Sequence, residues 1–145
     1  MSGRLEVLVL GSVEAQREAA PVALGGSKLQ ALVALLALGA PHPMSGDRLA
    51  DELWGDRPPA NPANALQAQV SRVRRLLGSD AVVRQGSAYR ISVEPDDVDA
   101  NRLGRLIKRA RAERQAGEAA DAITTFQSAL ALLRGHLSPA SAISS

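Results

Sequence analysis

The stretch Asn61–Leu77, NPANALQAQVSRVRRLL, decides the fold because it has the pattern of an amphipathic helix. Its larger apolar residues recur at helical spacing and predict a single buried stripe, made of Leu66, Val70, Val73 and Leu77. At about 100° per residue, the side opposite this stripe carries polar and small residues. They are Asn64, Ala68, Ser71 and Arg75, with Gln67 and Arg72 on the flanks and Arg74 nearer the core edge.

This polar side has the chemistry of a surface that contacts DNA. Amide and guanidinium groups read base edges, a small alanine lets a helix approach a thymine methyl, and further arginines hold phosphates. The alternative interpretation is a solvated helix face whose charges only keep the protein soluble. The segment alone leaves both interpretations open, and its neighbours favour the first.

The charges around this helix are unevenly distributed. The whole chain has a formal net charge of only +2, yet the range 61–90 holds five arginines and one acid. The preceding range 47–56 holds four acids and one arginine. We therefore expect a positive face and a negative face close together, which suits a protein with two partners.

The composition excludes several classes of protein. A chain of 145 residues, 46% of them hydrophobic, can form one ordinary domain or a small domain with an appendage. It has one Trp, one Tyr and one Phe, which argues against single-stranded nucleic acid or RNA loops bound by base stacking. The sequence has no cysteine, so it has no disulfides and no thiolate metal sites.

The segments that direct proteins to membranes are also missing from the sequence. The start MSGRLEVLVLG lacks the features of a signal peptide. The longest apolar run, 29–38, is shorter than the roughly 20 residues that span a bilayer. We expect a soluble, cytoplasmic protein with no membrane partner.

Three short strands and two helices are predicted before the amphipathic helix. Alternating runs at 4–10, 13–17 and 21–24 predict a small antiparallel sheet. Ser27 is expected to cap a buried helix that ends at Gly39, and Ser45 a second helix that ends at Gly55. The inward residues of that second helix are expected to be Leu49, Ala50, Leu53 and Trp54.

A β-hairpin and two more helices are predicted after the amphipathic helix. Strands at 81–84 and 88–93 flank the turn 85–87, and three helices followed by such a hairpin is the order of a winged helix-turn-helix. The range 95–98 is expected to be a hinge. Beyond it, helices over 99–116 and 118–133 are expected to pack as a hairpin. Their facing residues are predicted as Leu103, Leu106, Ile107 and Ala110 against Ala122, Ile123, Phe126, Ala129, Leu130 and Leu133.

Three runs together resemble a known family. They are LGGSKLQALVALLAL from Leu24, SGDRLADELWGDRPPANPANALQAQVSRVRRLLG from Ser45 and VVRQGSAYRI from Val82. Over Leu5 to about Gly135 the chain resembles the Streptomyces antibiotic regulatory proteins, whose DNA-binding domain is an OmpR/PhoB-type winged helix. The resemblance implies an α+β fold: a small antiparallel sheet, three helices, a hairpin wing and a helical hairpin.

This resemblance implies three segments. Residues 1–94 form the winged helix-turn-helix DNA-binding domain. Residues 95–135 are a truncated helical segment that resembles the start of the family's bacterial transcriptional activation domain. Residues 136–145 are expected to be a disordered tail.

The resemblance also implies roles for individual residues. The third helix enters the major groove, with Gln67, Ala68, Ser71 and Arg72 near base edges and Arg74 and Arg75 near phosphate. Asn64 is expected to contact phosphate at the start of that helix. Arg84 at the wing tip suits a narrow minor groove, and Arg90 is a further wing candidate that can instead pair within the sheet. The alternative for Arg72 is a surface salt bridge with an acid of the second helix.

A second partner is implied by the acidic side. In the wider fold the loop that corresponds to 55–61 contacts a sigma factor, so Asp51, Glu52, Asp56 and Arg57 are candidates for contact with RNA polymerase. The alternative is an ordinary acidic surface. A further basic surface, Arg102, Arg105, Lys108, Arg109, Arg111 and Arg114, is interpreted as a solvated helix face.

The sequence does not indicate an enzyme. Lys28 follows Ser27 instead of preceding a Ser or Thr as in a phosphate loop, and His42 and His136 have no partners at catalytic or zinc spacing. The acids Glu94, Asp96, Asp97 and Asp99 lack the pattern of a calcium loop. We expect no catalysis, no cofactor and no metal site.

Together these observations predict a sequence-specific, double-stranded DNA-binding transcriptional regulator in the bacterial cytoplasm, associated with the nucleoid. It is expected to be an activator that self-associates on direct repeats and recruits RNA polymerase. The alternative is a winged-helix module for protein interaction, or a short competitor of full-length regulators. Steep salt dependence of duplex binding would separate the two.

Overall fold

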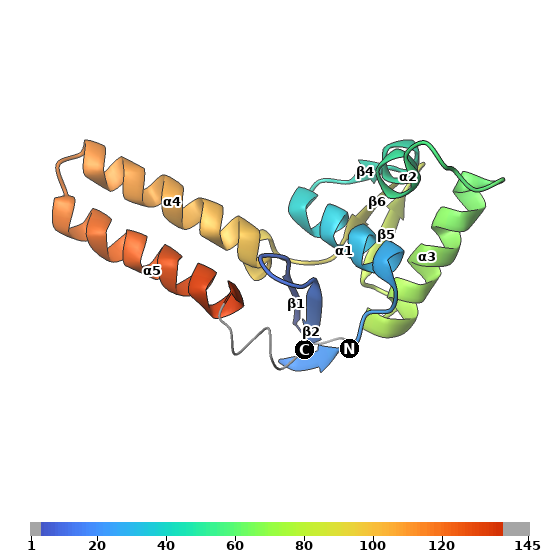
Figure 1. Ribbon diagram of the computed structural model, residues 1–145, viewed down its shortest axis with the longest axis horizontal. Coiled ribbons are helices and arrows are strands. Elements are labelled where there is room, and N and C mark those ends of the chain that lie inside the picture. Colours follow the sequence, from blue (N-terminus) through green and yellow to red (C-terminus); the bar gives the residue numbers. More distant parts are fainter. Residues whose placement is uncertain (1–3, 138–145) are drawn as a thin grey trace.

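The structure is a computed structural model that describes residues 4–137. Figure 1 shows an elongated molecule, with helices α1, α2 and α3 at one end, the paired helices α4 and α5 at the other, and the strands β1 and β2 between them. Within the described part, no helix combines the length and the apolar character needed to cross a bilayer.

The first three strands form the predicted antiparallel sheet, in the order β1-β2-β3. They are β1 (Leu5–Leu8), β2 (Glu14–Arg17) and β3 (Ala20–Val22). The two-residue turn between β2 and β3 places Glu18 and Ala19 at φ 51° and 63°, the positive values that tight hairpin turns require. Leu5, Val7 and Ala15 turn inward and join the hydrophobic core.

Three helices make up the centre of the winged part. They are α1 (Ser27–Gly39), α2 (Gly46–Trp54) and α3 (Pro62–Leu77). Ser45 caps α2, as predicted, by accepting a hydrogen bond from the backbone N–H of Arg48 at 3.1 Å. The prediction that Ser27 caps α1 is wrong, because Ser27 is already the first helical residue and the cap position is Gly26, which has no side chain.

A second sheet completes the winged helix-turn-helix. Strands β5 (Val82–Gln85) and β6 (Ala88–Ile91) form the predicted hairpin, and Gly86 takes the positive φ of 61° in its turn. The strand β4 (Met44–Ser45) pairs with β6 and was not predicted. Two residues are too short for a periodic signal, so only the folded chain reveals this strand.

The segment predicted to be a hinge is held in place by specific contacts. A short 3-10 helix, η1 (Pro95–Asp97), leads into α4 (Asp99–Gln115). Asp99 is fully buried and accepts hydrogen bonds from the backbone N–H groups of Val9 at 2.7 Å and Leu10 at 3.1 Å. Arg4 donates a hydrogen bond to Asp97, whose carboxylate raises the pKa of that guanidinium. Buried carboxylates thus tie this segment to residues on either side of β1, and the hinge stays a prediction.

Helices α4 and α5 (Ala119–Leu137) pack side by side, as predicted (Figure 1). Their facing surfaces are built from small residues, since Ala110, Ala122 and Ala129 are buried and Thr125 Oγ1 donates to Glu113 Oε1 at 2.6 Å. The predicted inward orientation of Ile123 and Leu130 is wrong, because their exposed fractions are 59% and 47%. Helix α5 reaches Leu137, and the rest of the predicted tail, 138–145, lies outside the described residues.

Candidate nucleic-acid interface

Helix α3 presents its polar side to solvent because its apolar stripe fills the core. Leu66, Val70, Val73 and Leu77 are each at most 2% exposed, which confirms the predicted stripe. The residues predicted opposite or beside the stripe are all exposed: Asn64, Gln67, Ala68, Ser71, Arg72 and Arg75. Asn61 fixes the start of the helix by accepting a hydrogen bond from the backbone N–H of Asn64 at 3.1 Å.

Two arginines of this face keep their guanidinium groups available. Within residues 4–137, neither Arg72 nor Arg75 takes part in an ion pair or a side-chain hydrogen bond. The salt bridge considered for Arg72 is therefore not formed. Both groups can bind an external anion without first giving up an internal partner.

Arg74 connects α3 to the wing. It is only partly exposed, and its Nε donates a hydrogen bond to the backbone oxygen of Val82 at 3.1 Å. The prediction that Arg74 lies nearer the core edge is confirmed. The bond fixes the distance between the helix and β5, so that the two elements present one continuous surface.

A groove of about 160 Å³ lies between α3 and the wing. It is lined by Gln67, Val70, Ser71, Arg74, Arg84 and Tyr89. The guanidinium of Arg84 lies over the ring of Tyr89, 5.9 Å from its centroid, and Nε of Arg84 donates to the backbone oxygen of Gly86 at 2.9 Å. These contacts place Arg84 beside the polar residues of α3.

Arg90 is not brought together with the α3 residues. It lies directly across from Val83, whereas Arg84 lies across from Tyr89, so the two arginines are on opposite faces of the hairpin. Arg90 lines a different pocket, which it shares with Arg4, Arg17 and Asp97.

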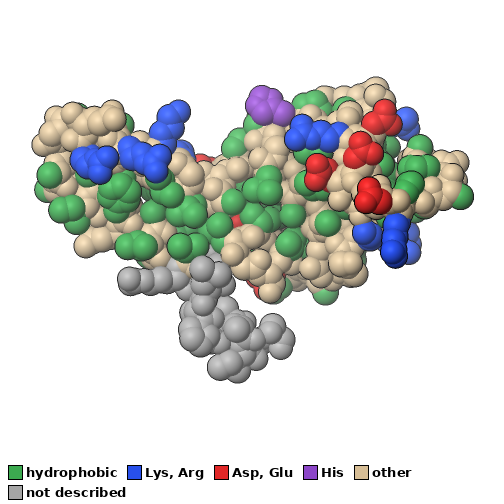
Figure 2. Space-filling model, turned by 45° about the horizontal axis from the view of Figure 1, so that its top comes forward, with side chains coloured by type: hydrophobic (Ala, Val, Ile, Leu, Met, Phe, Trp, Pro, Cys, Tyr) green, Lys and Arg blue, Asp and Glu red, His purple; other side chains and the backbone are tan. Residues whose placement is uncertain are grey.

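The acidic side predicted next to α3 is also present. Asp47, Asp51, Glu52 and Asp56 are exposed on α2 and the loop that follows it, as is Arg57. Figure 2 shows acidic side chains gathered over the end of the molecule that carries α2, with basic side chains at their border. The winged part thus carries both signs of charge on adjoining surfaces.

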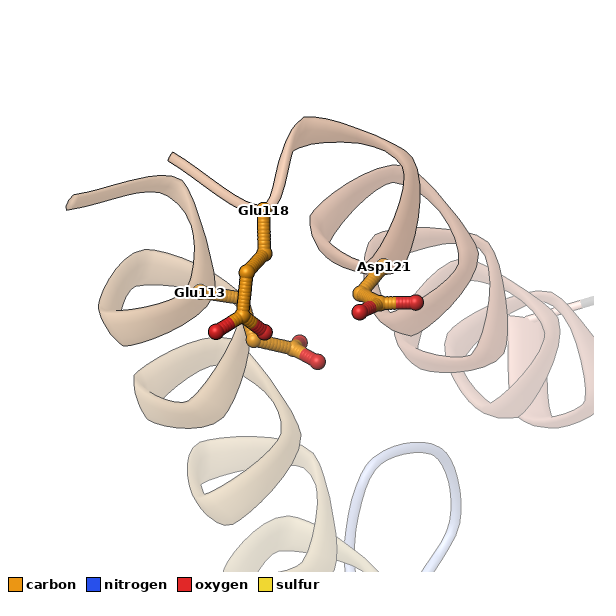
Figure 3. Close-up of side chains that lie close together, drawn as sticks. All are labelled: Glu113, Glu118 and Asp121. Carbon is orange, nitrogen blue, oxygen red and sulfur yellow. The ribbon is translucent and has the colours of Figure 1, made fainter. Parts of the chain in front are cut away.

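A further group of acids lies at the turn between α4 and α5 (Figure 3). Carboxylate oxygens of Glu113, Glu118 and Asp121 come within 4.8 Å of one another. Glu113 already accepts the Thr125 hydroxyl hydrogen bond, and the other two side chains are exposed. This group is separate from the four acids that the sequence predicts to be unsuited to calcium, Glu94, Asp96, Asp97 and Asp99. Of those four, Asp96 accepts a hydrogen bond from Arg105, Asp97 accepts one from Arg4, and Asp99 accepts from backbone N–H groups.

Sequence reasoning missed one polar residue beside this surface. Gln69 lies on the flank of α3 that faces α1, and its buried Oε1 has no hydrogen-bond partner within the described range 4–137. The helical projection could have placed Gln69 on that flank, but its burial depends on α1 and on the loop before it.

The chain is similar to several bacterial regulatory proteins. No family model matches it. It is 33% identical over 141 residues to the Transcriptional regulator RedD of Streptomyces coelicolor, covering 92% of this chain and 40% of that protein. It is 30% identical over 142 residues to the Regulatory protein DnrI of Streptomyces peucetius, covering 90% of this chain and 52% of that protein. The chain thus spans about half or less of the length of these relatives.

A solved structure shows the same fold. The structure described as Mycobacterium tuberculosis EmbR in complex with low affinity phosphopeptide matches 92% of this chain and 37% of its own, with a TM-score of 0.81 and 23% sequence identity. This match confirms the predicted α+β fold with a winged helix-turn-helix. The relatives confirm the resemblance to the Streptomyces antibiotic regulatory proteins, since they are regulators of that family with 30–33% identity over most of this chain.

Proposed function

We propose that this chain, a homologue of the Streptomyces antibiotic regulatory proteins, is a DNA-binding transcription regulator that reads duplex DNA with its winged helix-turn-helix. One observation carries the proposal: the polar face of α3 is exposed and holds two guanidinium groups that have no partner among the residues that the structure describes. An exposed arginine pair suits contact with the phosphates that border a DNA groove, and the same helix shares a groove with Arg84 of the wing.

In this proposal α3 lies in the major groove. Gln67, Ala68, Ser71 and Arg72 approach base edges, because amides and guanidiniums match the donor and acceptor pattern displayed there. Arg75 and Asn64 hold phosphates, which fixes the register of the helix on the duplex. Arg74 acts mainly as the connection between α3 and β5.

The wing supplies the second contact. Arg84, held over Tyr89 at the side of the groove next to α3, reaches the neighbouring minor groove or its backbone. Arg90, the other predicted wing contact, is turned to the opposite face of the hairpin, and we expect it to add little to the affinity for DNA.

The acidic surface of α2 is the proposed contact with RNA polymerase. Asp51, Glu52, Asp56 and Arg57 are exposed and close to α3 in sequence and in the fold, so a basic region of a sigma factor could reach them while α3 holds DNA. The regulator is then an activator, which binds direct repeats as side-by-side copies and acts on chromosomal DNA in the bacterial cytoplasm.

The proposed division of labour follows the predicted segments. Residues 1–94 bind DNA, and residues 95–135 begin an activation domain. Asp97 and Asp99 attach the second segment to residues on either side of β1. A movement of the activation segment would therefore shift the DNA-binding domain.

Selection of bound duplexes from a random pool tests the proposal. We expect an enriched motif arranged as direct repeats, and affinity for a selected duplex that falls steeply as salt rises. Arg111→Ala on α4 provides a matched control for arginine variants of α3, since Arg111 is also exposed. An absence of saturable duplex binding would contradict the proposal and favour the protein-interaction module.

A further inference from the structure

A cavity of about 670 Å³ opens between the start of α1 and the flank of α3. It is formed by the loop 23–26, the first residues of α1 and four side chains of α3, which are Gln69, Arg72, Arg75 and Leu76. Its volume lies in the range of roughly 300–1,000 Å³ typical of sites for small molecules. The DNA-binding role does not require a hollow at this position.

One end of the cavity attracts anions. Helix α1 begins there with no side-chain cap and no acid in its first turn, so its first backbone N–H groups and the positive end of its dipole are uncompensated. Gly26 has open space where a side chain would lie, which lets a ligand come close to the backbone. Arg72 and Arg75 face the same space from α3.

The remaining walls of the cavity are mainly apolar. Leu24 and Leu29 contribute from the side of α1, and Leu76 from α3 is 41% exposed, although it is a large apolar residue. Gln69 also lines the cavity, but its Oε1 is buried and is not open to a ligand. A DNA phosphate would use the guanidiniums but would leave the leucines without an apolar partner.

We propose that the cavity binds a small organic anion: a carboxylate carried on an apolar body. The carboxylate lies between the guanidiniums of Arg72 and Arg75 and the start of α1, and the apolar body lies on the leucines. Because Arg72 and Arg75 also belong to the α3 face, the anion competes with DNA, a consequence that rests on the proposed function.

Binding can be measured without DNA on the full chain. The probe is hydroxynaphthoate, a fluorescent aromatic carboxylate with a hydroxyl group, and the comparison is its neutral amide. We expect saturable binding of the acid and at least roughly tenfold weaker binding of the amide, since a carboxylate between two guanidiniums forms charge-assisted hydrogen bonds. Equal affinity for acid and amide, or no saturable binding of the acid, would overturn the proposal.

Two leucine variants locate the site. Leu76→Ala is expected to weaken hydroxynaphthoate binding about fivefold, because it removes part of the apolar wall. Leu38→Ala is the matched control, since Leu38 is 52% exposed on α1 but does not line the cavity. Equal losses in the two variants would place the probe elsewhere. Circular dichroism spectra of both variants establish that they are folded.

A competition experiment separates this inference from the proposed function. With a labelled duplex at low salt, we expect the apparent Kd for DNA to rise with the hydroxynaphthoate concentration, and Leu76→Ala to shift that response without changing duplex affinity. Joint binding of probe and duplex with no change in Kd would overturn the competition. If no duplex binds at all, the proposed function fails, while the direct titration still decides whether the cavity takes an anion.

Discussion

Helices α3 and α4 are both rich in arginine, but they present their charges differently. Helix α4 has six basic residues and α3 only three. On α4, Arg105 pairs with Asp96 at 2.8 Å, Arg109 lies 3.8 Å from Glu113, and Arg102 donates to the backbone of η1. On α3, neither Arg72 nor Arg75 has such a partner among residues 4–137. Other residues of the same helix, Gln67 and Ser71, share a groove with Arg84 of the wing.

This difference shows that the arrangement of charged residues indicates a nucleic-acid-binding surface better than the number of charged residues does. The basic side of α4 lies at the far end of the molecule from α3 and has no wing beside it (Figure 1). Its charges are partly neutralised by acids of the same segment, as expected of a solvated helix face. Helix α3 combines unpaired guanidiniums, amides and small residues on one exposed face, which is what base reading requires.

The largest expected difference between α3 and α4 is in how much their packed leucines contribute to the free energy of unfolding. Leu66→Ala on α3 removes a side chain that is 2% exposed and should lower the free energy of unfolding by about 2–5 kcal/mol. Leu106→Ala on α4 removes a half-buried side chain and should cost about 1 kcal/mol. Urea denaturation monitored by circular dichroism and by Trp54, the only tryptophan, measures both. Equal costs would mean that α3 is not anchored more firmly than α4.

A second effect concerns how α4 is attached. Asp99→Ala leaves the backbone N–H groups of Val9 and Leu10 without their acceptor, and should destabilise the protein by about 1–3 kcal/mol. The control is Asp96→Ala, which removes only the exposed pair with Arg105 and should cost less than about 1 kcal/mol. Hydrogen exchange of the β1 amides is expected to accelerate in the first variant alone. Unchanged exchange would favour the hinge interpretation of this segment.

The sequence was sufficient where structure depends on near neighbours. The stripe of α3, the Ser45 cap and the turn at Gly86 follow from spacing and residue type within a few positions. The candidate face could be predicted for the same reason, since the positions opposite a buried stripe are set by helix geometry.

The sequence was insufficient where distant segments meet. The bonds of Asp99 join residues 89 and 90 positions apart, and no local pattern encodes them. Ile123 and Leu130 were placed inward because large apolar residues usually are, but α4 and α5 pack through alanines and leave these two exposed. The orientation of Arg90 depends on the register of the two hairpin strands. The cavity beside Gln69 depends on how closely α1 approaches α3.

The next prediction tests the comparison of the two helices directly. Arg72→Ala should weaken binding to a selected duplex by about 1–3 kcal/mol and relax the preference at one base position. Arg111→Ala on α4 should change affinity by less than about 0.5 kcal/mol, because it removes an equal charge from the other end of the molecule. Fluorescence anisotropy and repeated duplex selection measure the two quantities. A preserved base preference in the Arg72 variant would exclude its role in reading bases.

The smallest expected effect sharpens the comparison within the wing itself. Arg84→Ala should weaken duplex binding by roughly 1 kcal/mol, about fivefold in Kd, because Arg84 shares a groove with α3. Arg90→Ala should leave Kd nearly unchanged, since Arg90 lies on the opposite face of the same hairpin. The two variants remove the same charge six residues apart, so non-specific electrostatics alone would lower affinity equally. Equal losses would therefore show that the orientation of the wing contributes nothing and that net charge alone holds it to DNA.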